Sequence, residues 1–113
     1  MDAGKLRYRI TIQRQEQIQN PQTGAITTTW VDYLTNVPAE IQFLSARELI
    51  AAAATQSQVM ARIIIRWRPD PIDPSMRIVH QGKIYNIHGA IPDNITGKQH
   101  YTLPCSQGVN DGN

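Results

Sequence analysis

The chain has 113 residues, a length that fits one domain with one modest core and argues against two full domains. Its formal net charge of +2 does not call for a nucleic-acid partner, and 41% hydrophobic residues with real aliphatic runs are typical of a folded chain. A single cysteine, Cys105, excludes an internal disulfide framework and a cysteine-rich zinc module, so we expect a reducing, cytoplasmic setting. The longest aliphatic run, residues 63–65, predicts no membrane span, and residues 1–5 do not begin a signal peptide.

The first third of the chain predicts a hairpin with a long tip. Residues 6–13 alternate apolar and polar side chains, which indicates a half-buried strand. Residues 15–24 contain Asn-Pro and Thr-Gly, two turn-forming pairs, and the Thr-rich residues 25–33 predict the returning strand. A break at residues 34–36 separates this hairpin from a third predicted strand at 37–43.

One helix is predicted, at residues 44–56. Ser45 fits its N-cap, and Glu48 three residues later completes a capping box. Leu44 and Leu49 have the spacing of a hydrophobic staple around that cap.

The rest of the chain predicts short strands around stiff loops. Three prolines within residues 69–74 forbid regular structure there. The pattern predicts a mainly β fold, a small antiparallel β-barrel of about six or seven strands with one short helix in an inserted segment, 44–58. We expect one barrel domain over residues 1–105 and a flexible tail over 106–113. The later strands are predicted at residues 59–68, 76–80, 83–91 and 99–105.

Chemistry-bearing residues form no motif of a catalytic or metal site. The histidines lack metal-ligand spacing, two aspartates suit turns better than a cation loop, and Cys105 fits a buried, inert thiol. Nucleophile elbows and phosphate-binding glycine loops are missing from the sequence. We therefore expect no enzyme, no catalytic or metal site and no cofactor. The histidines and aspartates are His80, His88, His100, Asp70 and Asp73.

Cations recur on one face of two predicted strands, and would form a basic strip if those strands lay side by side. Tyr8 and Trp67 are expected on the opposite, core face, whereas a single-strand binding platform needs aromatics between its cations. We interpret the cations as solvated faces that discourage edge pairing, with nucleic-acid binding as the alternative. The candidate basic faces are Lys5, Arg7 and Arg9 on one strand, and Arg62, Arg66 and Arg68 on the other.

The order of short motifs along residues 3–105 resembles the phage head-tail joining family, also called head-closure or head completion proteins. The resemblance begins with the opening run AGKLRYRITIQ and continues through LSARE, IIIRW and the pair MRI and GKIYNI to the late LPC. It rests on the order and spacing of these pieces together. They occupy residues 3–13, 44–48, 63–67, 76–78, 82–87 and 103–105.

This resemblance implies a structural, non-enzymatic virion protein, made in the bacterial cytoplasm and placed in the neck of a tailed phage or prophage particle. It implies a homo-oligomeric ring, a dodecamer in the virion and a monomer in isolation, with packaged DNA passing through. Its partners would be the portal-adaptor ring on one side and tail-terminator or tail proteins on the other. A tail-terminator or tail-completion protein and a small nucleic-acid-binding β-barrel are the alternatives.

The helix-bearing segment is the strongest candidate for a protein interface. An apolar stripe runs along it beside polar residues suited to partner contacts, although the same stripe is also suited to covering the barrel. The tip at 15–24 and the proline loop at 69–74 are further candidates, with ordinary surface loops as the alternative. The candidate interface residues are Leu44, Arg47, Glu48, Leu49, Ile50 and Ala53.

Overall fold

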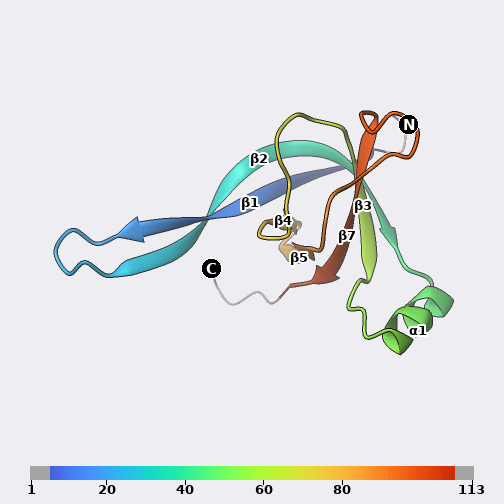
Figure 1. The fold of residues 1–113 in the computed structure, drawn as a ribbon, viewed down its shortest axis with the longest axis horizontal. Helices are drawn as coiled ribbons and strands as arrows, with labels where there is room; N and C mark the ends of the chain where they lie inside the picture. The colour runs from blue at the N-terminus through green and yellow to red at the C-terminus, as the bar shows by residue number, and fades with distance from the viewer. Residues whose placement is uncertain (1–5, 109–113) are drawn as a thin grey trace.

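The computed structural model describes residues 6–108 and has a mainly β fold with one short helix (Figure 1). This confirms the predicted fold class. Within that range the elements are β1 (Tyr8–Gln19), β2 (Ile26–Phe43), α1 (Ala46–Ala54), β3 (Ala61–Arg66), β4 (Arg77–His80), β5 (Lys83–Ile87), β6 (Ile91–Pro92) and β7 (His100–Gln107).

All strands belong to one antiparallel sheet that closes on itself. Their order is β3-β2-β1-β4-β5-β7-β6, and β7 pairs with β3 as well. Six strands therefore form a closed ring, which leaves fewer free edges than an open sheet. The two-residue β6 pairs with Tyr101 and Thr102 on the same strand that β5 joins further along.

The hydrophobic core fills the inside of this ring. Ile63 and Ile65 on β3 are fully buried, whereas Ile64 between them and Arg62 before them are only half-buried. Strand side chains alternate between two faces, so the predicted period of two places every second residue inside. The core cluster consists of Ile10, Ile12, Val37, Ala39, Ile63, Ile65, Met76, Ile78, Tyr85, Ile87, Leu103 and Cys105.

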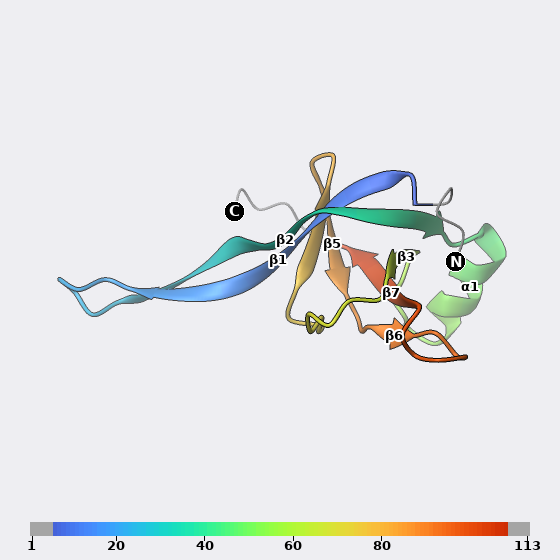
Figure 2. The same cartoon turned by 90° about the horizontal axis from the view of Figure 1, so that it is seen from above.

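A two-stranded arm projects from the ring, and we define it as residues 14–31 (Figures 1 and 2). The predicted long tip at 15–24 is wrong, because β1 continues to Gln19 and β2 resumes at Ile26. The turn between them is closed by hydrogen bonds from Gly24 N–H to Asn20 O and from Asn20 N–H to Ala25 O, both 2.8 Å. Gly24 has φ of 74°, a conformation that glycine adopts without strain. The arm accounts for much of the 51 Å length of the molecule.

The predicted third strand at 37–43 is also wrong as a separate element, because it is the second half of β2. Asn36 takes a positive φ of 55°, and the β1–β2 register shifts on both sides of Ile12. Such bulges bend a strand and increase its twist without ending it. The bend carries β2 from the arm into the ring, where its pairing with β3 begins at Ala39, one residue after Pro38.

Other boundaries also differ from the sequence prediction. The strand predicted at 59–68 spans only Ala61–Arg66, and the helix predicted at 44–56 spans Ala46–Ala54. β5 ends at Ile87 rather than continuing to residue 91. β7 continues through Ser106 and Gln107, which pair with Asn86 and Tyr85, so these two residues belong to the sheet and not to a tail. The proline loop at 69–74 is irregular, as predicted, and Ser75 N–H donates to Asp73 there at 2.9 Å.

A buried arginine fastens the arm to the ring. Arg77 on β4 is only 5% exposed, its Nε donates to Gln13 Oε1 at 2.8 Å, and its guanidinium lies 4.2 Å from the centre of the Trp30 ring. Gln13 in turn donates through Nε2 to Asp32 at 2.9 Å. We call these four residues the Arg77 clamp. It holds both strands of the arm where they leave the ring.

Candidate functional site

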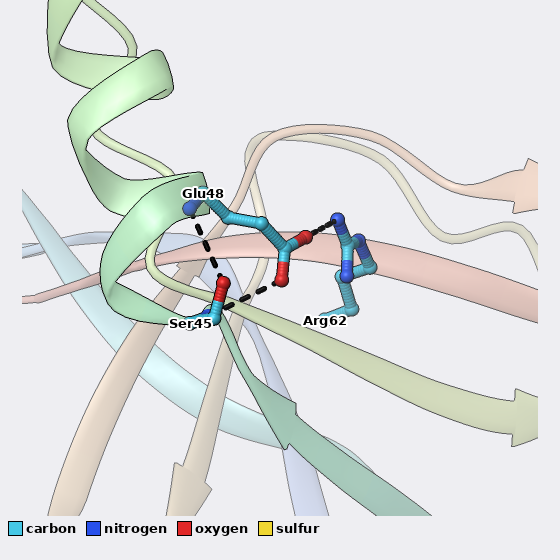
Figure 3. Close-up of polar contacts among 3 residues, drawn as sticks. All are labelled: Ser45, Glu48 and Arg62. Carbon is cyan, nitrogen blue, oxygen red and sulfur yellow. Dashed lines mark hydrogen bonds and ion pairs between the residues drawn. The ribbon is translucent and has the colours of Figure 1, made fainter.

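The helix α1 stands at the end of the molecule away from the arm tip (Figures 1 and 2). It begins as predicted at the N-cap Ser45, whose Oγ accepts from Glu48 N–H, while Glu48 Oε1 accepts from Ser45 N–H, both at 3.2 Å (Figure 3). Such a box satisfies two of the free N–H groups at a helix start. Leu44 N–H donates to Met60 O at 2.9 Å, so both ends of the segment return to the same place on the ring.

Glu48 also ties the helix to β3. Its Oε2 accepts from Arg62 at 2.6 Å, so one carboxylate serves the cap and an ion pair (Figure 3). The hydrogen bond from Arg62, and then those from Ser45, lower the pKa of Glu48. Because the bound form is the ionised one, these contacts persist to a lower pH than that at which an unperturbed glutamate protonates, and they weaken when Glu48 protonates. Both side chains of the pair remain 42% exposed, so its role is to orient the helix more than to stabilise the fold.

The apolar stripe of α1 meets solvent. Leu49 is 43% exposed and Ile50 72% exposed, Ala53 and Arg47 are exposed as well, and no residue of the helix is buried. Leu44, just before the cap, is half-buried. The alternative that the stripe covers the barrel is therefore wrong. An exposed apolar stripe of this kind is typical of a surface that meets another protein.

The first candidate basic face is spread along the start of β1. Lys5 lies outside the described residues, and Arg7 and Arg9 are exposed. The guanidinium of Arg9 lies 3.3 Å from Leu6 O and 3.4 Å from Tyr8 O, so it caps local backbone carbonyls. These contacts hold Arg9 against its own strand.

The second candidate basic face lies on and after β3, and two of its three arginines pair with carboxylates. Arg62 binds Glu48, and Arg68 lies 3.2 Å from Asp70, which leaves Arg66 exposed on the strand. In the sheet β2 lies between β1 and β3. The two faces are therefore not on neighbouring strands, and the structure does not join them into one strip.

Neither aromatic residue expected on the core face is in the core. Tyr8 is 42% exposed at the rim of the ring, where β1 begins. Trp67 is half-buried and lines a surface hollow with Pro38 and Arg68, just after β3 ends. Alternation fails at these two positions because each lies at a strand end, where the ring no longer encloses the inward-pointing side chain.

Cys105 is fully buried, as expected for a structural thiol. Its Sγ lies 3.1 Å from Leu103 O, and burial raises the pKa of the thiol to about 12 from an ordinary value of 9.0. At pH 8 the folded protein should hold roughly 1,000-fold less thiolate at this position than the unfolded chain. We therefore expect a chromogenic disulfide reagent to label Cys105 only after denaturation. Rapid labelling of the native protein would contradict this burial.

The described part of the chain, residues 6–108, contains no cluster of three or more His, Cys, Asp or Glu side chains that could hold a metal ion. Over the same residues, the single helix is too short to cross a bilayer. Sequence reasoning missed the arm and the Arg77 clamp. The clamp joins residues that are 64 positions apart, a contact that no local pattern reveals.

Fold and surface together define a small mainly β protein whose two projections, the arm and α1, lie exposed at opposite ends. The chain belongs to the phage head completion protein family, whose model matches residues 1–108. This confirms the family that the sequence motifs indicated, and the family is one of structural virion proteins. At this level of detail the chain is a structural protein of a phage head or neck.

Two solved structures are similar to the chain. The solution structure of protein SF1141 from Shigella flexneri 2a has 34% sequence identity and a TM-score of 0.75, covering 97% of this chain and 99% of that one. A chain from the virion of a native gene transfer agent particle shares the fold at 13% identity and a TM-score of 0.56, covering 89% and 94%. No functionally curated protein shows significant sequence similarity.

Proposed function

We propose that this protein joins the portal-adaptor side of a phage or prophage head to the tail and helps to retain the packaged DNA. The observation that carries this proposal is the placement of two exposed projections at opposite ends of a closed ring of strands. A joining protein needs contact surfaces in two directions and a body that keeps their spacing. The closed β sheet supplies that body, and membership of the head completion family supplies the setting.

On this proposal the protein acts in the virion neck as a homo-oligomer. Its copies form a larger ring around the DNA channel, distinct from the ring of strands within each copy. One side meets the portal adaptor and the other meets a tail-terminator or tail protein. A ring subunit uses two different patches, so that each copy contacts its neighbours head to tail. The stripe on α1 is the proposed contact with the head, and Arg47 at its first turn adds a polar contact beside it.

The α1 stripe is tested by replacing Leu49 and Ile50 with serine. Because both side chains are exposed, we expect melting within a few degrees of the wild type but a loss of head attachment of at least about tenfold, as for truncated interface anchors. Attachment is measured as the fraction of tail-free heads that retain the protein after gradient sedimentation. The control is Ala51→Ser with Ala54→Ser, which adds two serines to other exposed positions of the same helix. Equal attachment of both variants would remove α1 from the interface.

The joining role itself is tested by deleting the gene from the phage or prophage that encodes it and imaging the lysate. Separate DNA-containing or leaky heads beside complete free tails are expected, and added purified protein should restore joining. Intact virions would overturn the proposal. A tail terminator, in contrast, would bind isolated tails and ignore tail-free heads.

A further inference from the structure

A small aromatic groove lies on the ring where β1 begins, β2 ends and β4 turns into β5. Tyr8 and Phe43 line it and remain 42% and 58% exposed, and Lys83 adds a positive charge at its edge. Tyr8 meets His80 edge to face, with ring centres 5.3 Å apart, and His80 Nδ1 lies 3.1 Å from Arg9 O. The groove is thus held in shape, and its exposed rings suit an apolar side chain accompanied by an acidic one.

The arm presents a side chain pair of that chemistry. Glu16 and Ile18 are two residues apart on β1, so they point to the same face of the arm, and Ile18 is 55% exposed. Gln15, Gln17 and Gln19 point to the other face. An exposed isoleucine on a two-stranded ribbon has little to pack against, because such a ribbon has no second layer. Among residues 6–108, the Glu16–Ile18 face therefore has no second layer packed against it.

An arm does not reach the groove of its own chain. Tyr8 and Gln19 are the two ends of β1, which separates the groove from the arm tip by roughly 35 Å of extended strand. The Arg77 clamp fixes the direction of the arm away from the ring. The complementary surfaces, one apolar and acidic and the other aromatic and basic, can therefore meet only between copies.

We propose that the arm of one copy docks in the aromatic groove of a second copy, with Ile18 against Tyr8 and Phe43 and Glu16 facing Lys83. This inference deepens the proposed function and rests on the ring assembly included in it. Because the two surfaces differ, the contact is heterologous, and every copy uses the Glu16–Ile18 face of its arm on one neighbour and its groove on the other. The opposite face of the arm stays exposed for a contact beyond the ring of copies. A series of such contacts closes into a ring of copies when the rotation from one copy to the next adds up to a full turn.

The test is disulfide crosslinking in assembled particles. The doubly substituted chain Ile18→Cys, Lys83→Cys complements a deletion of the gene, and purified particles are oxidised and analysed on non-reducing gels. We expect a ladder of multimers beyond the dimer, since each copy is linked to two neighbours. Coexpressed single variants, Ile18→Cys with Lys83→Cys, should stop at dimers. The native Cys105 is buried, so we expect it to form no crosslinks of its own.

The matched control is Gln17→Cys with Lys83→Cys, which places the arm thiol one residue away on the opposite face. Its ladder should be at least about tenfold weaker. Particles that contain the protein but yield no ladder, equal ladders from both pairs, or dimers only from the double variant would each overturn the docking while leaving the joining role standing. If purified wild-type particles did not contain the protein at all, the proposed function itself would be overturned.

If the cysteine variants do not assemble, exchanging the charges of Glu16 and Lys83 tests the docking instead. Glu16→Lys and Lys83→Glu singly should each lower incorporation of the protein into particles at least about fivefold, as expected for like charges at an interface. The double exchange should restore most of that loss. Single variants that incorporate normally, or a double variant no better than its parents, would contradict the pairing of Glu16 with Lys83.

Discussion

Replacing Ile63 by alanine is expected to lower the free energy of unfolding by about 2–5 kcal/mol. Ile63 is fully buried and lies opposite Ile41 on β2 and Leu103 on β7, where the ring of strands closes. The truncated side chain leaves a cavity that neighbours paired on both sides cannot easily collapse to fill. Urea denaturation followed by circular dichroism measures the loss as a shift in midpoint at unchanged slope.

Ile64 supplies the control for this prediction. It is the next residue of the same strand but points outward and is half-buried. Its replacement by alanine removes the same atoms from a partly solvated position, so we expect a cost below about 1 kcal/mol. Similar costs at both positions would mean that the inside of the ring is not the core.

Replacing Arg77 by alanine is expected to cost about 1–3 kcal/mol and to loosen the arm while the ring stays folded. The substitution leaves Gln13 Oε1 without its donor and removes the cation from the face of Trp30. A two-stranded ribbon is marginally stable alone, so the arm depends on what holds its base. Amide hydrogen exchange should accelerate at residues 14–31 more than in β3 and β7, and Trp30 fluorescence should change.

Arg14 provides the comparison for the clamp. Its guanidinium lies 5.6 Å from the Tyr33 ring centre and its side chain is exposed, so it resembles Arg77 in chemistry but not in burial. Arg14→Ala should change stability by less than about 1 kcal/mol. An equal loosening of the arm by both substitutions would show that general charge, and not the buried clamp, holds the arm.

The strands of the ring were predictable because one face of each meets the core and the other meets solvent, so apolar and polar residues alternate along the sequence. In β3 the buried Ile63 and Ile65 alternate with less buried neighbours, and the same period of two marks β1 at Ile10 and Ile12. The cap of α1 was predictable because Ser45 and Glu48 are three residues apart and interact locally.

The arm was not predictable from the same signal, since both faces of its strands meet solvent. Residues 14–28 are exposed whatever their type, so burial imposes no alternation there. The Asn-Pro and Thr-Gly pairs mark the turn, but they do not say how far the strands extend on either side. An apolar stripe on a short helix is equally compatible with packing on the core and with facing solvent. The exposure of Leu49 and Ile50 could therefore not be predicted from the sequence.

The dual pairing of β7 also constrains how the chain folds during synthesis. β7 is the last of the seven strands found within residues 6–108, yet both β3 and β5 use it as a partner. Until residues 100–107 leave the ribosome, those two strands keep open edges, and the apolar inside of the ring remains accessible. Ring closure is therefore a late, long-range event, which favours slow folding and gives chaperones a reason to engage the nascent chain.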